Sequence, residues 1–436
     1  MHQSLPLFEQ VATSSPTAST RAQGAPRLKR ANRAQLLLRP VDLEATLAAD
    51  HEARAIWRVV QCLDLSRFLV PIRAREGEPG QSAIDPAILI TLWLYATSQG
   101  VGSARELDRL CKEHDAYRWI CGGVSVNYHT LADFRVDHRE ALDELFTQVL
   151  AVMMKEGLVN LSRVAQDGTR TRASAGADSF RRERTLTELL AEARAQVEHV
   201  KCLAEDASVT VREAAAHKRA AREREERIGR AITELPKIRE SKKTEDDKKE
   251  ARASTTDPEA RVMKMGDGGF RPAYNIQFAT TTEEKVIVGV GVTNSGSDKN
   301  ELGEMLAQIE ARAGQRPREM LVDGGFVKLE EITAATENGT TVYAPVPTKK
   351  GQEPDYHPKP TDSEAVAAWR QRMGTSEAQE IYKERGETAE LPNAHVKSRF
   401  GLTQLPVRGT QKVLAVSLWM GLTYNILRWI SLAGST

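Results

Sequence analysis

The sequence contains few cysteines and almost no net charge, and each of these deficits excludes a class of protein. Its four cysteines form no C-x-x-C pair and have no matching histidine spacing. That argues against a structural zinc site and against a disulfide framework, and it is typical of a reducing cytoplasm. The formal net charge is only +1 over 436 residues. Any binding of nucleic acid would therefore depend on local basic patches rather than on a basic protein.

Three further features that define common protein classes are missing. No G-x-x-x-x-G-K-S/T loop is present, and Gly289 and Gly291 lack the third glycine of a dinucleotide-binding loop, so we expect no nucleotide cofactor. No charged-then-apolar leader opens the chain, and we expect no secretion. The most apolar run, residues 413–430, contains Asn425 and Arg428. These polar residues favour a core helix over a membrane span.

The amino-terminal part of the chain changes from an aperiodic to a helical pattern. Residues 1–40 are rich in Ser, Thr, Ala, Gln and Arg without periodicity, and we expect a disordered arm there. Residues 41–158 have helical patterns throughout. Within them, Asp85 and Pro86 form a pair that is typical of a helix start. The pattern predicts a separate helical domain.

A pair of glycines, residues 122–123, interrupts this helical domain. A new helix then begins at Asn127 or His129. Short helices around such a turn are typical of a helix-turn-helix reader of DNA, although helical bundles that bind nothing share the pattern. We expect three side chains of the new helix to point outward, the first two toward DNA: Thr130, Arg135 and His138.

Residues 159–436 alternate between strand and helix patterns, which predicts an α/β domain with a mixed sheet. The first strand-like run lies within residues 161–173. Apolar residues then recur at steps of three and four from residue 186 to 235, which predicts a long charged helix or an antiparallel helical hairpin. With a polar linker at residues 240–256, this segment would be a coiled-coil-like helical insertion, residues 179–256. Further strands are expected at residues 273–282, 286–293, 318–322 and 340–344, with helices between and after them.

The tetrapeptide Asp-Gly-Gly-Phe occurs twice, and the context separates the two copies. Asp323 directly follows an apolar strand, so it lies at the end where α/β sheets place their ligands. Asp267 has no strand before it, and we expect it in a turn. Asp167 also follows a strand-like run. The sequence thus predicts Asp167 and Asp323 at the ends of strands.

A third carboxylate comes from residues 381–400, IYKERGETAELPNAHVKSRF. Pro392 is tolerated in the first turn of a helix but not deep inside one. We therefore expect Glu390 at or just before a helix start, with Lys397 two turns later on the same face. A solvated helix end of mixed charge is the alternative. Three converging carboxylates can hold two divalent ions, and such ligands suit Mg²⁺.

Several passages together resemble a bacterial insertion-sequence transposase of the DDE type, which has an RNase H-like catalytic domain. They are VAQDGTRTRASAG around Asp167, LVDGGF around Asp323, and residues 381–400. In the helical part, DPAILITLWLYATSQGVGSARELDRLCKE and SVNYHTLADFR resemble the amino-terminal domain of such transposases. The likeness extends over most of the chain from about residue 40 to 430.

One departure from the family pattern concerns the glutamate. The family signature reads Tyr, two residues, Arg, three residues, Glu, six residues, Lys. This sequence has Tyr382 and Arg385 at that spacing, but four residues separate Arg385 from Glu390, and six then precede Lys397. Glu387 is the rival, but nine residues separate it from Lys397 and no helix start follows it. We choose Glu390.

The resemblance implies a catalytic site and its partners. Asp167, Asp323 and Glu390 would be the catalytic residues and would bind two Mg²⁺ ions, or Mn²⁺ in their place. Tyr382 and the two basic residues, Arg385 and Lys397, would contact DNA near the cut. The partners would be double-stranded DNA, as terminal inverted repeats and as target, and further copies of the chain in a dimer or higher oligomer. The location would be the cytoplasm, at the bacterial nucleoid.

We therefore predict a DNA transposase that cuts the ends of an insertion sequence and joins the exposed 3′-hydroxyls to target DNA. Two alternatives remain open. One is a metal-dependent nuclease that cuts DNA without joining it. The other is a DNA-binding or assembly protein whose catalytic site has decayed. The complete carboxylate set argues against decay, whereas the shifted spacing between Arg385 and Glu390 favours it.

Overall fold

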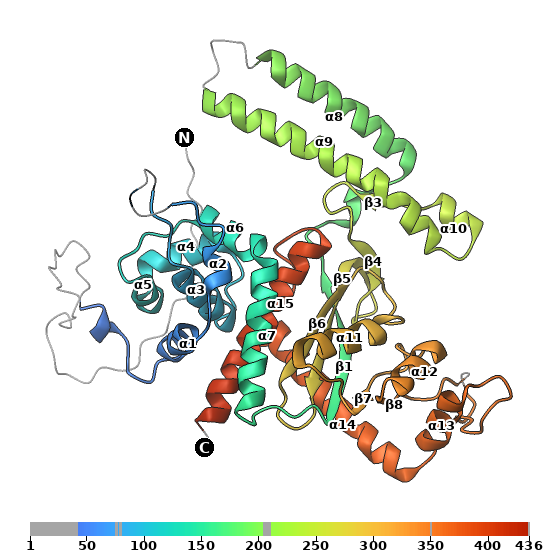
Figure 1. Ribbon diagram of the computed structural model, residues 1–436. Helices are drawn as coiled ribbons and strands as arrows, with labels where there is room; N and C mark the ends of the chain where they lie inside the picture. Colours follow the sequence, from blue (N-terminus) through green and yellow to red (C-terminus); the bar gives the residue numbers. More distant parts are fainter. Residues whose placement is uncertain (1–41, 75–76, 78–80, 204–210, 349–350, 435–436) are drawn as a thin grey trace, which may run out of the picture. The chain divides into compact units, whose positions relative to one another are not determined.

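The computed structural model describes residues 42–74, 77, 81–203, 211–348 and 351–434. The expected disordered arm at residues 1–40 lies outside these residues. The described chain begins with helices and continues, from β1 on, into a part with a mixed sheet (Figure 1). The mixed α/β fold agrees with the prediction from the sequence.

Side-chain caps determine where several helices of the first part begin. Asp85, Ser103 and Asn127 each accept a hydrogen bond from a backbone N–H in the first turn of the helix that follows. These caps satisfy N–H groups that have no partner inside the helix. After the short η1 (Glu44–Thr46), the helices are α1 (Glu52–Gln61), α2 (Ser66–Leu69), α3 (Pro86–Ser98), α4 (Ala104–Glu113), α5 (Asp115–Cys121), α6 (Tyr128–Asp137) and α7 (Arg139–Lys155).

The prediction that Arg135 points outward from α6 is wrong. Arg135 is only 8% exposed, and its guanidinium lies 4.5 Å from the ring centroid of Trp93. It donates a hydrogen bond to the carbonyl of Gly102 at 2.6 Å. His138 is half-buried and packs against aromatic rings, and Thr130 is also half-buried. Packing against α3 therefore turns Arg135 into the protein rather than toward a partner.

The central strand of the sheet is β1 (Arg163–Arg172). It pairs antiparallel with β5 (Phe270–Thr281). The second edge of β5 pairs antiparallel with β4 (Arg261–Lys264) and β6 (Ile287–Thr293). The β5–β6 hairpin agrees with the expected strands. Strand β4 was not expected, and it places Asp267 in a turn between two paired strands.

The other side of β1 belongs to the parallel half of the sheet. β1 pairs parallel with β7 (Glu319–Leu321), which pairs parallel with β8 (Thr341–Tyr343). Parallel neighbours need a crossover connection. α11 (Glu301–Ala313) precedes β7, and α12 (Leu329–Glu337) connects β7 to β8. The strand order is therefore β4, β5, β1, β7, β8, and β6 also pairs with β5 (Figure 1).

α15 (Thr410–Ala433) is long and apolar enough to cross a membrane, yet 72% of its most apolar window is buried inside the structure. It packs against β6, α3 and α7. The fully buried Asn425 side chain donates to the carbonyl of Ile287 at 2.7 Å and accepts from its N–H at 2.9 Å. Arg428 donates to the carbonyl of Glu284. The polar residues of this apolar run thus bind backbone in and next to β6, as a core helix requires.

Between β1 and β4 the chain forms α8 (Glu183–Leu203) and α9 (Val211–Glu240) (Figure 1). The first residue of α8 forms an ion pair with Arg239, which lies near the end of α9. The two helices therefore run antiparallel, and of the two expected arrangements the structure has the hairpin. Their shared apolar core contains Leu186, Ala193, Ile228, Ala231, Leu235 and Ile238.

The segment expected to be a polar linker, residues 240–256, is partly ordered into secondary structure. It contains α10 (Glu245–Lys249) and β3 (Ala253–Ser254), which pairs with β2 (Phe180–Arg181). Thr244 accepts a hydrogen bond from a backbone N–H in the first turn of α10. Ala253 is buried in the apolar core of the helical hairpin. Capping and burial by tertiary contacts override the polar composition of the segment.

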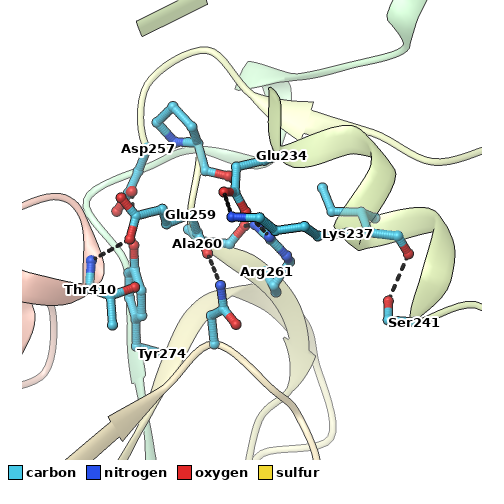
Figure 2. Close-up of polar contacts among 12 residues, drawn as sticks. Glu234, Lys237, Ser241, Asp257, Glu259, Ala260, Arg261, Tyr274 and Thr410 are labelled. Atoms are coloured by element: carbon cyan, nitrogen blue, oxygen red, sulfur yellow. Dashed lines mark hydrogen bonds and ion pairs between the residues drawn. The ribbon is translucent and has the colours of Figure 1, made fainter. Parts of the chain in front are cut away.

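Figure 2 shows the polar contacts where the hairpin meets the sheet. Glu234 on α9 forms ion pairs with Lys237 on the same helix and with Arg261 at the start of β4. The Tyr274 hydroxyl donates to the buried Asp257 at 2.9 Å. A cavity of about 1060 Å³ is partly lined by Glu234 and Arg261. Its lining includes neither Asp167 nor Asp323.

Candidate active site

Strand register places Asp167 and Asp323 next to each other. Ala165 in β1 aligns with Leu321 in β7, and the two strands run parallel. Asp167 and Asp323 each follow two residues later, so they lie at the same level of the sheet. One detail of the prediction is wrong, because β1 continues to Arg172 through its pairing with β5. Asp167 therefore lies inside its strand, while Asp323 follows the end of β7.

The Asp167 carboxylate is largely removed from solvent, with 25% of its side chain exposed. Burial raises its pKa to about 6; Arg385 acts in the opposite direction, and repulsion by Asp323 adds to the rise. Two carboxylates that repel each other in a buried place favour the binding of a cation. The electrostatics of Asp167 are therefore those of a candidate metal ligand.

α14 (Ser376–Ala394) directs polar side chains toward Asp167. Arg385 Nη1 lies 3.8 Å from Asp167 Oδ1, and Asn393 Nδ2 donates to Asp167 Oδ2 at 3.1 Å. Arg385 and Asn393 are eight residues apart, which places them about 80° apart around the helix axis, on the same side of the helix. The Arg385 guanidinium lies 5.9 Å from the ring centroid of Tyr382. The helix thus holds a cation, an amide and an aromatic ring beside the β1 carboxylate.

Lys397 adds a second positive charge near Asp167. It lies in a π-helical turn, η3 (His395–Arg399), that follows α14 directly. Burial lowers the pKa of Lys397, while attraction by Asp167 acts in the opposite direction. Arg385 and Lys397 are therefore both close enough to Asp167 to interact with it. Arginine and lysine at such a place are suited to hold phosphate oxygens.

Glu390 does not begin a helix, contrary to the expectation from Pro392. Thr375 caps α14 by accepting a hydrogen bond from the N–H of Ala378. The helix continues through Glu390 and Pro392 and ends two residues later. At that point the missing N–H of proline affects only the last turn, and a π-helical turn follows. Glu390 is exposed.

Helix geometry distinguishes Glu390 from its rival Glu387. Glu390 lies roughly 60° around the helix axis from Asn393, and Glu387 lies roughly 120° from it. Both side chains are exposed. Because Asn393 contacts Asp167, Glu390 is the nearer of the two to the face that meets β1. Its choice as the catalytic glutamate stays a prediction.

A carboxylate that sequence reasoning missed, Asp298, lies beside the two aspartates. Its Oδ1 accepts hydrogen bonds from Asn275 Nδ2 at 2.6 Å and from Gln277 Nε2 at 2.7 Å. Repulsion by Asp298 also contributes to the raised pKa of Asp167. A signal was present in the sequence, because Asn275 and Gln277 interrupt a strand of mostly apolar residues and point to the same face.

Asp267, in the other Asp-Gly-Gly-Phe copy, is not part of the group of carboxylates formed by Asp167, Asp323 and Asp298. Asp267 is exposed in the turn between β4 and β5, where both of its carboxylate oxygens accept hydrogen bonds from Arg271. Its oxygen also accepts a hydrogen bond from the N–H of Gly269 at 3.0 Å. The turn that was expected for Asp267 is confirmed.

The donor set fits a hard divalent cation. Asp167, Asp323 and Asp298 supply carboxylate oxygens, which are the ligands that Mg²⁺ prefers. Two neighbouring amide oxygens, on Asn275 and Asn393, are buried and accept no hydrogen bond within the described chain. The same described residues contain no group of three side chains already in coordinating geometry. A cation would relieve the repulsion among these carboxylates and draw them together.

A mixed sheet that carries adjacent carboxylates beside two basic residues is suited to metal-dependent cleavage of phosphodiesters. Comparisons with known families give the same class. Residues 41–137 match a family model described as Transposase domain (DUF772), and residues 239–426 match one described as Transposase DDE domain. No curated protein and no solved structure matches the chain. The chain belongs to the DDE-type transposases of insertion sequences.

The match to the DDE domain includes some of the candidate residues and not others. Asp323, Glu390, Arg385 and Lys397 lie inside the matched residues, and Asp167 lies before them. The choice of Asp167 therefore depends on its position in the sheet and on its contacts with α14.

Proposed function

We propose that this protein cuts DNA at the ends of an insertion sequence and joins the exposed 3′-hydroxyls to target DNA. The observation that carries the proposal is the parallel register of β1 and β7, which sets Asp167 beside Asp323. Arg385 and Lys397 supply positive charge at the same place. Adjacent carboxylates and cations are what cleavage and joining of phosphodiesters need.

The sheet supports an RNase H-like catalytic domain with a helical insertion. Strands β1, β5 and β6 are neighbours in an antiparallel arrangement, and β7 and β8 extend the sheet in parallel on the other side of β1. The α8–α9 hairpin lies in the chain between β1 and β4, within the proposed insertion at residues 179–256. The proposed catalytic domain therefore starts near residue 159 and follows a helical domain at residues 41–158.

Each residue of the site has a proposed role. Asp167 and Asp323 would bind two Mg²⁺ ions, with Glu390 as the third carboxylate and Mn²⁺ as an alternative metal. When bound, such ions stabilise the attacking and leaving oxygens of a phosphodiester displacement. Asn393 holds the Asp167 carboxylate in position through its hydrogen bond. Arg385 and Lys397 would neutralise phosphate oxygens of the DNA, and Tyr382 would support Arg385.

Double-stranded DNA is the partner that follows from this role. The helical domain would recognise the terminal inverted repeats, with α5, the glycine turn and α6 as the helix-turn-helix. Thr130 lies in the first turn of α6 and remains a proposed DNA contact, whereas the burial of Arg135 argues against such a role for it. Synapsis of two ends requires at least a dimer on the DNA. The protein would work in the cytoplasm, at the nucleoid.

Strand cleavage and joining on DNA that carries the flanking repeats of the parent element would test the proposal. Reactions would contain Mg²⁺ or EDTA and the unmodified chain or one of three variants, D167A, D323A and E390A. D267A is the matched control, because it removes the exposed aspartate of the same Asp-Gly-Gly-Phe tetrapeptide. We expect joined products with the unmodified chain and D267A only, and only with Mg²⁺.

The remaining outcomes separate the alternatives. Cleavage without joining, when target DNA is supplied, would indicate a nuclease. Binding of the repeats without a Mg²⁺-dependent product would indicate a protein with a decayed site. Activity of E390A together with an inactive E387A would move the third carboxylate to Glu387 and leave the function unchanged.

A further inference from the structure

Asp298 lies in the loop between β6 and α11, three residues before α11 begins. An aspartate just before a helix commonly caps it, yet the Asp298 side chain turns toward the sheet instead. Its Oδ1 accepts from the amides of Asn275 and Gln277 on β5. Both of these residues are fully buried. The sheet therefore fixes the orientation of the Asp298 carboxylate, and the loop alone does not.

The two oxygens of Asp298 lie against the backbone beside both candidate aspartates. A methyl group added to Gly168, the residue after Asp167, would lie 2.6 Å from Asp298 Oδ1. A methyl group on Gly325 would lie 3.3 Å from Asp298 Oδ2 and 2.9 Å from Asp323 Oδ1. Glycine at both positions leaves room for the carboxylate. Asp298 thus lies between the chain at Asp167 and the chain at Asp323.

Nearby oxygens point to a ligand at this place. Asn275 Oδ1 is buried and accepts no hydrogen bond within the described chain. It lies 2.7 Å from the position of a methyl group on Gly168, so it faces the same space. Both amide donors bind Asp298 Oδ1, whereas Asp298 Oδ2 lies on the side of Gly325. Oxygens without donors, beside carboxylates, are suited to a cation.

We propose that Asp298 is a further catalytic carboxylate that binds a divalent metal ion together with Asp167 and Asp323. In this arrangement the sheet side of the site supplies three carboxylates, and Glu390 approaches from α14 on the other side. The proposal deepens the proposed function, on which it rests. Asn275 and Gln277 act as positioning residues, because they hold one oxygen of Asp298 and leave the other for the metal.

The test is a titration of the full-length protein with Mn²⁺, with the free ion measured by electron paramagnetic resonance and Mg²⁺ added as competitor. D298N removes the charge and keeps an oxygen that can accept from Asn275 and Gln277. D267N is the matched control on an exposed aspartate. We expect the Kd for Mn²⁺ to rise by about tenfold or more in D298N and to stay unchanged in D267N. Equal binding by D298N and the unmodified chain would overturn the proposal.

A second pair of variants tests the proposal even if D298N does not fold. G325A keeps all carboxylates but places a methyl group between Asp298 Oδ2 and Asp323 Oδ1, whereas a methyl group on Gly324 meets only Pro345 at 3.4 Å. We expect weaker Mn²⁺ binding in G325A and unchanged binding in G324A, with equal melting temperatures. Unchanged binding in G325A would count against the proposal.

This readout does not depend on transposition. Weaker Mn²⁺ binding in D298N would support the role of Asp298 even if the unmodified chain neither cut nor joined DNA, which would reject the proposed function alone. Normal Mn²⁺ binding in D298N, with an unmodified chain that cuts and joins DNA, would reject Asp298 alone.

Discussion

Arg385 in the catalytic part and Arg135 in the helical part lie on helices beside aromatic rings, but their surroundings differ in one respect. Arg385 lies 3.8 Å from the Asp167 carboxylate and keeps 23% of its side chain exposed. Arg135 is 8% exposed, and the partner of its guanidinium is the carbonyl of Gly102. Burial lowers the pKa of Arg135 to about 10. The first arginine can reach a ligand, and the second holds two helices together.

The difference shows which of the two arginines is available to a ligand. The Arg135 guanidinium packs over an indole ring and donates to one carbonyl, and its Nε is buried without a hydrogen-bond partner among the described residues. A guanidinium beside a carboxylate that is itself held in a sheet remains available to a phosphate. The DNA recognition proposed for the helical part would therefore depend on side chains other than Arg135.

The largest expected effect is on strand cleavage, and it comes from substitution of Asp167 in the sheet. D167N should lower strand cleavage on the order of 10³-fold, because it removes a charged group that would hold the metal ions. The melting temperature should not fall, since the change also removes repulsion between Asp167 and Asp323. Cleavage rates with repeat-end DNA and a thermal melt would measure both. A D167N variant with near-normal cleavage would contradict the assignment.

A change of Arg385 should affect activity and leave stability intact. R385A should reduce cleavage on the order of 10²-fold through loss of a phosphate contact, with DNA binding and the melting temperature nearly unchanged. R385K keeps the charge and should retain part of the activity. Cleavage measured at saturating DNA would show the effect. Unfolding of R385A would show that Arg385, like Arg135, mainly stabilises the fold.

Substitution of Arg135 in the helical part should lower stability rather than catalytic activity. R135A should lower the free energy of unfolding by about 2 kcal/mol, because it leaves the Gly102 carbonyl without its donor and removes packing against Trp93. R135M fills the space and should be less destabilised. Urea denaturation would measure both variants. Specific loss of repeat recognition in a fully stable R135A would restore Arg135 as a DNA contact.

The raised pKa of Asp167 predicts a dependence of stability on pH. The ordinary value is 3.8 and the folded value is about 6, so between these values the folded state binds more protons than the unfolded state. Stability should therefore fall as pH rises through this window. In EDTA, the slope of unfolding free energy against pH between these values should be less negative in D167N than in the unmodified chain. Identical slopes in both proteins would show that Asp167 has an ordinary pKa.

The smallest effect is expected at Asp267. Its ion pair with Arg271 is exposed, and such pairs contribute at most about 1 kcal/mol. D267N should cut and join DNA within about twofold of the unmodified chain and melt at nearly the same temperature. A large loss of activity would mean that the second Asp-Gly-Gly-Phe copy takes part in catalysis.

The sequence was sufficient for the features that depend on local pattern. Apolar runs predicted the strands, and they placed Asp323 just after its strand, where the structure has it. N-caps such as Asp85 predicted helix starts correctly. These features succeed because strand alternation and capping act over a few residues.

Features that depend on tertiary contacts were not predictable from the pattern. Asp298 lies in a Ser- and Gly-containing loop, and although Asn275 and Gln277 stand out in β5, no local pattern shows that their amides hold Asp298. Pro392 suggested a helix start, but Thr375 had already started the helix far upstream. The burial of Arg135 depends on Trp93, more than 40 residues earlier in the sequence. Periodicity alone does not select which helix face meets the core.

The pairing of Asp167 with Asp323 as a metal site is the central claim, and metal-directed cleavage of the protein tests it most directly. Fe²⁺ substituted for Mg²⁺ would be treated with ascorbate and peroxide, which generate hydroxyl radicals next to the bound ion. The products would be mapped by mass spectrometry. We predict cuts in β1 near Asp167 and after β7 near Asp323, which excess Mg²⁺ suppresses. Suppressible cuts near Asp267, with none near Asp167 and Asp323, would contradict the account.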